Sequence, residues 1–435
     1  MSAPDTADPP ATPPARLLPR AARGAGALAA VLGVAVLAVI AFTTPWRALP
    51  AGAPEVPADP ARDFGAEQIA RSEALDAVTA APVYISLGLT LVLAGLLIAT
   101  PLGARVLDRL KGPWWVRVPV AVAALTAAVE VLRWPLGMWA ETYLREYGLS
   151  TQTWLTWSLD RLKGIGVRTA LLALAVLAVV ALARRVARWW IPAALGACAL
   201  TVVGSFVYPV LIEPVYNDFR PMPAGQLRDD LLAMAARDGV PVDDVLVADA
   251  SRRTTALNAY VSGFGATRRI VVYDTLLKAP PGEIELIAAH ELGHAKRDDV
   301  LYGTLIGALG AGFGTCLIAV AAATPFVRRR TGVAALADPR AAGLLLGLIT
   351  LGTVLSGPVQ NIVSRHIEAR ADVHALNLTR DPATFVAMQK RLATTNLSDL
   401  SPDALEVALY GSHPPTPERI ALARAWARFN HLPEP

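Results

Sequence analysis

Repeated apolar runs of about bilayer length constrain this chain more than any other feature of its sequence. A membrane-spanning helix needs roughly 20 mostly apolar residues. Seven runs approach that length: residues 26–43, 83–102, 116–132, 169–183, 189–212, 300–326 and 341–359. Because most of these runs lack a polar face, a soluble protein with apolar core helices does not explain them. The sequence therefore predicts a mostly α-helical, multi-pass membrane protein with about seven spans, the third interrupted by Glu130.

The composition supports a membrane location and excludes two other classes of protein. Charged residues make up 17% of the chain and hydrophobic residues 54%, whereas soluble domains carry about a quarter charged residues. Cys198 and Cys316 lie inside apolar runs and predict neither a disulfide nor a thiolate metal site. No basic stripe with interleaved aromatics indicates nucleic-acid binding. The richness in Ala, Val, Pro, Gly and Arg is typical of GC-rich bacteria, so we expect a bacterial cytoplasmic membrane protein.

The polar segments divide the chain into further parts. We expect five: a disordered N-terminal tail (1–24), five spans with polar connectors (25–212), a small α+β peptidase unit (213–299), two spans and the helix after them (300–371), and a polar helical tail that completes the active site (372–435). Within the α+β unit, residues 223–239 have helical periodicity and residues 245–248 read as a short strand. Residues 257–263 and 269–275 flank a glycine-containing turn, which predicts a hairpin.

Two histidines at helical spacing predict a metal site. In His290-Glu-Leu-Gly-His294 the imidazoles are four residues apart, so on a helix they share a face and can bind one tetrahedral metal. Glu291 lies between them, where its carboxylate can take a proton from a water that zinc has activated. This pattern predicts a zinc metallopeptidase with Glu291 as general base.

The third metal ligand is left open by the residues alone. Glu368 and Asp372 share one face of the helix that follows the last span, so Glu368 can bind the metal while Asp372 accepts the free N–H of a ligating imidazole. His366 and His374 lie in the same segment and are alternative third ligands.

These motifs resemble, in the same order, those of the zinc-dependent membrane CAAX prenyl proteases, a gluzincin family. They are His290-Glu-Leu-Gly-His294, the Glu368 and Asp372 pair, Asn258-Ala-Tyr, and His413-Pro-Pro-Thr-Pro-Glu-Arg419-Ile. The chain is similar, less closely, to HtpX-type membrane proteases. The resemblance covers most of the chain beyond the N-terminal tail. It implies Glu368 as the third zinc ligand, and a barrel of helices around a chamber that holds the zinc.

The resemblance also implies roles for three further residues and a substrate class. Asn258 is expected on a strand edge that pairs with the substrate backbone, and His413 is expected to donate to the oxyanion. Arg419 is expected to bind substrate or to brace the site through an ion pair. The substrate would be a peptide or protein cleaved next to a C-terminal prenylated cysteine. In a bacterium the alternative is an unlipidated membrane or misfolded protein, handled as in HtpX-type quality control.

Two rival functions and one open question remain at this stage. An ion-coupled transporter would use Glu130, His290, Glu291 and Glu368 as an ion path, and an inactive scaffold would keep only the fold. Neither explains a zinc spacing with every catalytic group present. The side of the membrane that the zinc faces stays open. The resemblance places it in the cytosol, whereas Arg clusters near residues 105–111, 184–188 and 328–330 place it outside, because positive loops stay in the cytoplasm.

Overall fold

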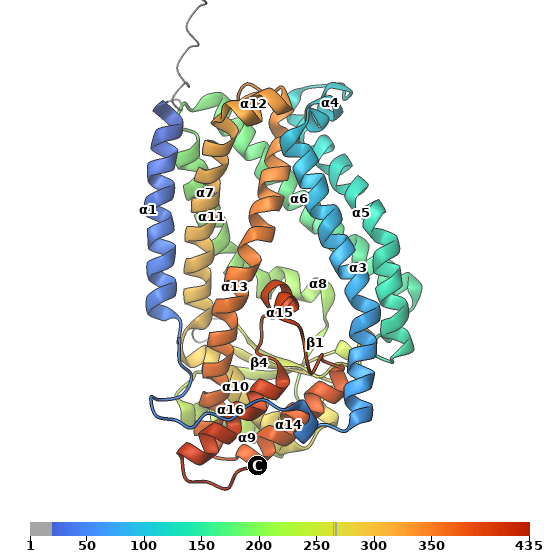
Figure 1. Ribbon diagram of the computed structural model, residues 1–435, viewed down its shortest axis with the longest axis vertical. Coiled ribbons are helices and arrows are strands. Elements are labelled where there is room, and N and C mark those ends of the chain that lie inside the picture. Colours follow the sequence, from blue (N-terminus) through green and yellow to red (C-terminus); the bar gives the residue numbers. More distant parts are fainter. Residues whose placement is uncertain (1–19, 264, 266–267) are drawn as a thin grey trace, which may run out of the picture.

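Seven helices are long and apolar enough to span a membrane, among the residues that this computed structural model describes: 20–263, 265 and 268–435. They run along the long axis of the molecule (Figure 1): α1 Arg20–Thr43, α3 Ala66–Ala99, α5 Trp114–Glu146, α6 Trp154–Arg185, α7 Trp190–Val207, α11 Asp299–Ala323 and α13 Ala342–Thr379. The prediction of a mostly α-helical chain with about seven spans is confirmed.

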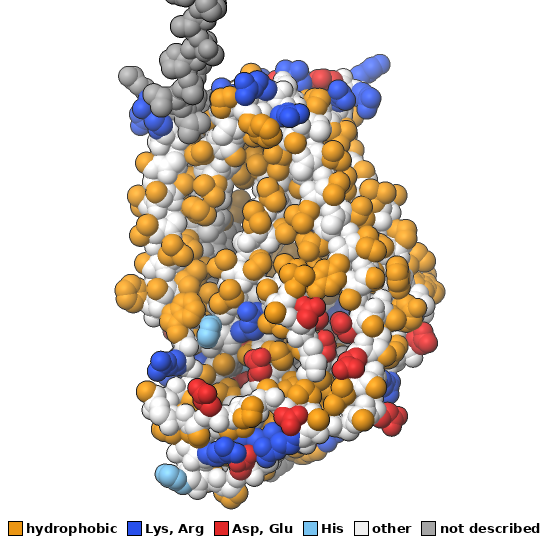
Figure 2. Space-filling view, viewed as in Figure 1, with side chains coloured by type: hydrophobic (Ala, Val, Ile, Leu, Met, Phe, Trp, Pro, Cys, Tyr) orange, Lys and Arg blue, Asp and Glu red, His pale blue; other side chains and the backbone are white. Residues whose placement is uncertain are grey.

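The sides of this bundle are suited to lipid rather than water. Phe42 is 90% exposed and Leu200 is 70% exposed, and both point outward from spanning helices. Figure 2 shows hydrophobic side chains covering the length of the bundle, while charged side chains gather at its upper end and over the lower third. Apolar surface on this scale is costly in water. Helices tolerate hydrocarbon because their backbone hydrogen bonds are satisfied internally.

Several helices extend beyond the apolar runs that predict them. The runs at 116–132 and 169–183 belong to α5 and α6, which continue to Glu146 and begin at Trp154. In the extensions, Arg145 Nε donates to the Glu141 carboxylate at 2.8 Å, and the rings of Trp134 and Trp157 pack with centroids 5.4 Å apart. An ion pair and an aromatic contact therefore stabilise the parts of α5 and α6 that extend beyond the apolar runs.

The first helix also starts earlier than the sequence predicts. α1 begins at Arg20, so residues 20–24, assigned above to a disordered tail, are helical. Residues 1–19 lie outside the described residues. Shorter helices connect the spans: α2 Pro60–Asp63, α4 Leu102–Asp108, α8 Glu213–Tyr216, α12 Pro325–Thr331, a π-helix Tyr208–Ile212 and a 3-10 turn Pro339–Ala341.

A small α+β unit closes the lower end of the bundle (Figure 1). Its four-stranded sheet has the order β1-β2-β4-β3, with β1 Phe219–Pro221, β2 Asp244–Ala248, β3 Ala259–Ser262 and β4 Arg269–Tyr273. Strands β2 and β4 are parallel and the other two pairs are antiparallel, which leaves β3 at an edge. The predicted hairpin is β3 with β4; residues 264, 266 and 267 of its turn lie outside the described residues.

Helices cover this sheet and form its core. They are α9 Gln226–Asp238, α10 Pro281–Lys296, α14 Pro382–Asn396, α15 Ala404–Tyr410 and α16 Thr416–Phe429, with 3-10 turns at Ala250–Arg252 and Leu276–Lys278. Ile270 of β4, Leu292 of α10, Phe385 of α14 and Trp426 of α16 are almost fully buried in one apolar cluster. The sheet, α10 and the C-terminal helices therefore share a single core.

Helix α13 joins the membrane bundle to this unit. It has 38 residues, which at about 1.5 Å per residue is roughly 57 Å, well beyond the ~30 Å hydrocarbon core. Its first part packs against α3 and α4, and its last part packs against α10 and α16. The same continuous helix is therefore long enough to cross a bilayer and also to enter the core of the α+β unit.

A close approach of two glycines fixes the upper end of α13. A Cβ atom at Gly103 of α4 would lie 2.7 Å from the Cα of Gly343, and the next nearest atoms are also Gly343 backbone. Backbone cannot move aside as a flexible side chain can, so only glycine allows these two helices to pack this closely.

We expect Gly103→Val to destabilise the protein by about 1–3 kcal/mol, because overpacking forces the helices apart. The thermal midpoint of the detergent-purified protein measures this effect. Gly88→Val is the matched control, since a Cβ at Gly88 of α3 meets no atom within 4 Å. Equal midpoints for the two variants would contradict the proposed close packing.

Candidate metal centre and substrate cleft

Helix α10 carries both histidines of the metal motif on one face. Pro281 occupies its first turn, where the missing N–H costs nothing. Apolar neighbours such as Leu286 and Leu292 bury the helix against the sheet and α14. The imidazole rings of His290 and His294 lie with centroids 4.9 Å apart, and their Nε2 atoms are 3.2 Å apart.

Helix α13 brings a carboxylate to the same point from 78 residues further along the chain. Glu368 Oε2 lies 3.1 Å from His290 Nε2, and Glu368 Oε1 lies 3.6 Å from His294 Nε2. Glu368 is 8% exposed and His290 is 7% exposed, so both are buried. Of the residues predicted as third ligand, the structure brings Glu368 to the two histidines.

Carboxylates fix the tautomer of both imidazoles. His290 Nδ1 is 2.9 Å from Asp372 Oδ1, and His294 Nδ1 is 2.9 Å from Asp299 Oδ2. An ionised carboxylate only accepts hydrogen bonds, so each Nδ1 carries the proton. The lone pairs of both Nε2 atoms are then free and point toward Glu368, which is the arrangement of a metal-binding site.

The spacing and the electrostatics of these atoms fit a cation. Ligand atoms on a tetrahedral zinc or similar ion are about 3.3 Å apart, and the His290, His294 and Glu368 atoms are separated by 3.1, 3.2 and 3.6 Å. Burial lowers the pKa of His294, but hydrogen bonds to Asp299 and Glu368 outweigh burial and raise that pKa to about 10. The pocket therefore strongly favours positive charge where the three side chains meet.

Asp299 is a site residue that the sequence analysis missed. It is the first residue of α11, and its other carboxylate oxygen pairs with Arg370 of α13. The sequence contained an indication of this role, because Asp299 is only five residues after His294. A chain that turns sharply at the end of the helix can bring such a carboxylate back to the second imidazole. From the sequence alone, Asp298 was an equally good candidate for this contact with His294. In the structure the Asp298 side chain pairs with Arg268 instead.

Arg419 and His413 approach the centre from the C-terminal tail. Arg419 of α16 donates to Asp372 through Nε at 2.8 Å and through a second nitrogen at 2.5 Å, which is a bidentate ion pair. His413 Nε2 lies 3.3 Å from Glu368 Oε2, and its ring is exposed to the cleft. Of the two roles predicted for Arg419, this geometry favours bracing.

The loop that carries His413 is held by Arg365, a second residue whose role the sequence analysis did not predict. Arg365 of α13 donates through Nη1 to the carbonyls of Val407 and Gly411, at 2.8 and 2.5 Å. Asn361 Nδ2 donates to the Ala408 carbonyl at 3.1 Å. Helix α13 therefore positions both Glu368, the expected third ligand, and the loop that follows α15.

Glu291 is partly buried beside the two imidazoles. Desolvation raises the pKa of its carboxyl and outweighs the lowering by the nearby histidines and by the Val261 backbone N–H. That backbone contact ties Glu291 to the edge strand β3. The carboxylate also lines the cleft described next.

A cleft of about 740 Å³ opens onto this centre. His290, Glu291, His413 and Arg419 lie along its wall with Asn258. Apolar side chains also line it: Leu257, Ile287, Met388, Leu392 and Val407. Asn258 directly precedes β3, and its carbonyl accepts from the Tyr273 N–H at 3.0 Å. The cleft therefore combines apolar side chains with Asn258, the residue next to the edge strand β3.

One part of the cleft is acidic. The carboxylates of Asp76, Asp399 and Glu406 lie within 4.8 Å of one another, and Asp399 and Glu406 line the cleft. Burial and the neighbouring carboxylates raise the pKa of Glu406 to about 7. The cleft lining thus combines an acidic cluster with apolar side chains.

The remaining histidines and Glu130 have other partners. His366 packs against Trp46 with centroids 5.1 Å apart, and His374 Nε2 lies 2.9 Å from Asp238 Oδ2. His431 is exposed near the C-terminus. Glu130 of α5 pairs with arginines of α5 and α6: Arg133, Arg161 and Arg168. A carboxylate so neutralised is a poor member of the ion path that the transporter alternative requires.

Known families match nearly all of this architecture. The sequence profile of peptidase family M48 matches residues 221–427, and the profile described as CAAX prenyl protease N-terminal, five membrane helices, matches residues 72–218. The chain belongs to peptidase family M48. This confirms the resemblance inferred from the motifs, and with the spanning helices it makes the chain an integral, multi-pass membrane protein of a metalloprotease family.

Curated M48 relatives are similar over part of their length. The uncharacterized metalloprotease YhfN of Bacillus subtilis is 35% identical over 280 residues, which cover 63% of this chain and 66% of that protein. A CAAX prenyl protease 1 homolog of Arabidopsis thaliana is 35% identical over 51% of this chain and 52% of its own. The chain thus spans between about half and two thirds of these relatives.

A solved structure shows the same fold. The crystal structure of S. mikatae Ste24p superposes with a TM-score of 0.74, covering 94% of this chain and 100% of that chain, at 19% sequence identity. At that identity the likeness concerns the fold alone. M48 membership implies a bound metal, and the His290, His294 and Glu368 side chains are a donor set that fits one.

We expect Asp299→Asn to weaken metal binding by about 10–100-fold, the usual effect of removing a carboxylate that orients a ligating imidazole. Competition with a chelator during zinc titration measures the affinity. Asp298→Asn is the matched control, because it removes the same charge from the neighbouring residue, which contacts no imidazole. Equal affinities for the two variants would contradict the assignment of Asp299.

Proposed function

We propose that this protein is a membrane-embedded zinc metalloendopeptidase that hydrolyses peptide bonds in its cleft. The convergence of His290 Nε2, His294 Nε2 and the Glu368 carboxylate beside Glu291 carries this proposal. A two-histidine, one-carboxylate set is typical of catalytic zinc and leaves a coordination position open for water. The cleft gives a polypeptide access to that position.

Each residue around the centre has a chemical task. Zinc, held by His290, His294 and Glu368, would supply a Lewis acid that activates water. Glu291 accepts the proton of the attacking water on its carboxylate and passes it to the leaving amine. Nε2 of His413 donates a hydrogen bond to the oxyanion as the carbonyl is attacked. Asp372 and Asp299 hold the imidazoles in the required tautomer, and Arg419 keeps Asp372 ionised and in place.

The edge strand supports a way of holding the substrate. Among the described residues no strand pairs with the outer side of β3, so an extended peptide can add to the sheet there and gain backbone hydrogen bonds without particular side chains. Asn258, at the start of β3 and on the cleft wall, is the residue we assign to this contact. The apolar wall formed by residues such as Met388 and Leu392 suits a hydrophobic or lipidated segment.

We propose the substrate class separately from the peptidase activity, because it rests on the likeness to relatives. Several relatives are named CAAX prenyl proteases, so a prenylated C-terminal peptide is the first candidate substrate. An unlipidated hydrophobic segment of a membrane protein is the second, because the cleft offers apolar surface without selecting a particular lipid.

We expect Glu291→Gln to keep stoichiometric zinc and to lose turnover by at least about a thousandfold, because the ligands remain while the base is removed. Peptide hydrolysis and metal analysis of the purified protein measure the two effects. Glu285→Gln, on the same helix but away from the imidazoles, is the control. Full activity of Glu291→Gln would overturn the assigned base.

We expect Glu368→Ala to lose both zinc and activity, because a buried ligand is removed. His366→Ala tests the alternative ligand from the same helix and should retain both. Stoichiometric zinc in Glu368→Ala, together with zinc loss in His366→Ala, would reverse the ligand assignment.

A farnesylated CAAX peptide and its unprenylated twin test the substrate class. We expect zinc-dependent cleavage of both, with a higher kcat/KM for the farnesylated peptide because the lipid buries apolar surface in the cleft. Equal values would favour an unlipidated membrane-protein segment. Absence of cleavage with one bound zinc would exclude both peptides as substrates.

A further inference from the structure

Three arginines and one glutamate meet between α5 and α6, and the proposed reaction uses none of them. Glu130 and Arg133 lie on α5. Arg161 and Arg168 lie on α6, about two turns apart, so they share one face of that helix. All three arginines pair with the Glu130 carboxylate. We call these four residues the α5–α6 arginine cluster.

The α5–α6 arginine cluster has more positive than negative charge. Three guanidinium groups face one carboxylate, which leaves an excess of two positive charges. The nearest nitrogens of Arg133 and Arg161 lie 3.5 and 3.7 Å from the Glu130 oxygens, longer than a normal N–H···O hydrogen bond. Nε of Arg133 and Nε of Arg161 have no hydrogen-bond partner in the part of the chain that the structure describes. The cluster therefore holds charge and donors that the described protein does not satisfy.

The neighbouring cations on the same two helices are paired one to one. Arg145 Nε donates to the Glu141 carboxylate at 2.8 Å, and Lys163 Nζ lies 3.3 Å from Asp160 Oδ1. Each of these pairs is neutral as a whole. The excess of positive charge along the lower parts of α5 and α6 is therefore concentrated in the cluster.

The fold holds Arg161 in place before any ligand binds. A Cβ atom at Gly137 of α5 would lie 2.7 Å from Arg161 Nη1, so the lack of a side chain there leaves room for the guanidinium. Its Cζ lies 5.5 Å from the ring centroids of both Trp134 and Trp157, within cation–π range. The side chains of Arg161 and Arg168 are 26% and 49% exposed, so a ligand can reach them. A preordered, accessible cation favours binding because little side-chain freedom remains to be lost.

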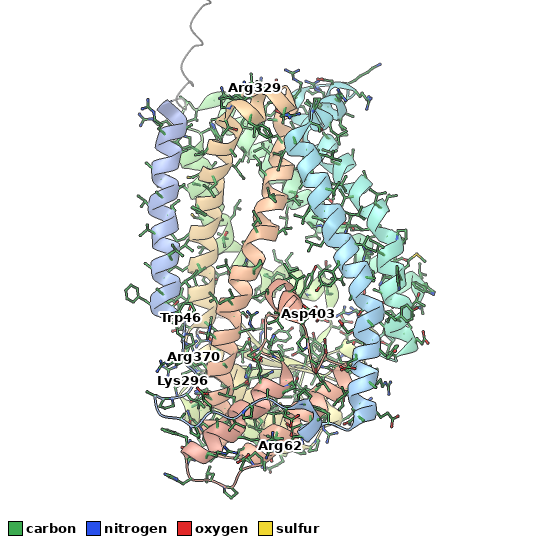
Figure 3. All side chains as sticks on the ribbon, viewed as in Figure 1. Trp46, Arg62, Lys296, Arg329, Arg370 and Asp403 are labelled. Carbon is green, nitrogen blue, oxygen red and sulfur yellow. The ribbon has the colours of Figure 1, made fainter. Side chains whose placement is uncertain are left out.

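The depth of the cluster in the membrane indicates the class of ligand. Arg133 directly follows the apolar run 116–132, and Arg168 directly precedes the run 169–183. The upper ends of α5 and α6 lie at the end of the bundle that Arg329 marks in Figure 3. Measured from there, the two arginines are about 28 and about 26 Å along their helices, close to the ~30 Å thickness of the hydrocarbon core. The cluster therefore lies at the headgroup level of the leaflet nearer the metal centre.

The surroundings of the cluster suit a lipid molecule. Toward the hydrocarbon, Val131, Leu171 and Leu174 are 70, 62 and 63% exposed. Beyond the cluster in the other direction along the helices, Trp139 and Trp154 are each 41% exposed, and such amphipathic rings favour the headgroup level. Apolar side chains, arginines and tryptophans thus follow one another in the order of the parts of a bilayer.

We propose that the α5–α6 arginine cluster binds the phosphate of an anionic phospholipid, whose acyl chains lie along the exposed apolar side chains of α5 and α6. Guanidinium groups bind phosphate oxygens through paired, charge-assisted hydrogen bonds, and basic pockets between spanning helices attract anionic headgroups. The excess of two positive charges favours a headgroup with net negative charge. In a zwitterionic headgroup an amine opposes the phosphate.

A lipid in this position stabilises the junction between the bundle and the α+β unit. The connector between α5 and α6 contacts that unit directly, because Ser150 forms a β-bridge with Thr254 and the Thr151 N–H donates to the Arg253 carbonyl at 3.1 Å. By joining the lower parts of α5 and α6, the lipid holds this connector in place. The inference does not rest on the proposed peptidase activity.

Thermal unfolding of the delipidated full chain in detergent tests the site, with tryptophan fluorescence as the readout. We expect phosphatidylglycerol to raise the midpoint by at least about 3 °C, because a ligand of the folded state stabilises it. Phosphatidylcholine with the same acyl chains, and inorganic phosphate, should leave the midpoint unchanged. An equal shift with phosphatidylcholine would overturn the charge preference, and an equal shift with phosphate would show a site for a free anion instead of a lipid.

Arg168→Gln tests the cluster itself, because Glu130 keeps Arg133 and Arg161 as partners. We expect the phosphatidylglycerol concentration at half-maximal shift to rise at least about tenfold, since a charge-assisted hydrogen bond is lost. Lys163→Gln, on the same helix but outside the cluster, is the matched control and should respond as the unaltered chain does. The same response in both variants would contradict the proposal.

Counting bound lipid guards against a variant that folds poorly. Native mass spectrometry of the unaltered chain, purified without delipidation, should show phosphatidylglycerol above its share of the membrane lipid. Arg168→Lys keeps the charge but loses the paired donors, so it should retain less. No enrichment on the unaltered chain would refute the site, whatever the stability of the variants.

A peptide with a free C-terminus and its amidated twin complete the thermal test. A shift with the free peptide alone, as large as that with phosphatidylglycerol, would overturn the lipid assignment and give the cluster to a peptide carboxylate. None of these readouts depends on catalysis, so the lipid site and the peptidase proposal fail separately.

Discussion

The contact between α10 and α13 is the interaction on which the rest of this structure depends. His290, Glu368 and Asp372 are buried there within hydrogen-bonding distance, and Arg419 of α16, which is partly buried, pairs with Asp372. Burying any of these groups alone would be strongly unfavourable, because the lost hydration of an isolated charge is not replaced. Together they form a network in which each charge has a partner of opposite sign. Removing one member leaves the others buried and unpaired, so the helices are held in one register.

The bilayer imposes a second constraint that this network must satisfy. Helix α13 enters from hydrocarbon, where its outer face is apolar, and continues into the α+β unit, where Glu368 and Asp372 are buried. A kink or a change of rotation between the two parts would move both carboxylates off the histidines. The position of the metal site therefore depends on contacts made elsewhere along α13. These are the close packing of Gly343 on Gly103 and the hydrogen bonds from Arg365 to backbone carbonyls.

The turn after α10 couples the site to a second spanning helix. Asp298 adopts a left-handed backbone with φ of 52°, and α11 starts at the next residue. This sharp turn returns Asp299 to His294 while Arg370 of α13 holds the same carboxylate. Two of the long apolar helices thus contact the imidazoles, α11 through Asp299 at its first residue and α13 through Glu368. The helices long enough to cross a membrane therefore supply the carboxylates of the centre.

The sequence by itself determined the spans and the chemical type of the site. Runs of apolar residues leave no alternative to membrane helices, and the spacing of His290, Glu291 and His294 is local to one helix, where 3.6 residues per turn fix the geometry. The approach of Glu368 to the two histidines and the hold of Arg365 on the His413 loop were decided by tertiary structure. They join residues that are far apart in the chain, and spacing along the chain carries no information about that distance. Asp299 is close to His294 in sequence, but only the turn between α10 and α11 decided that Asp299 rather than Asp298 contacts the imidazole.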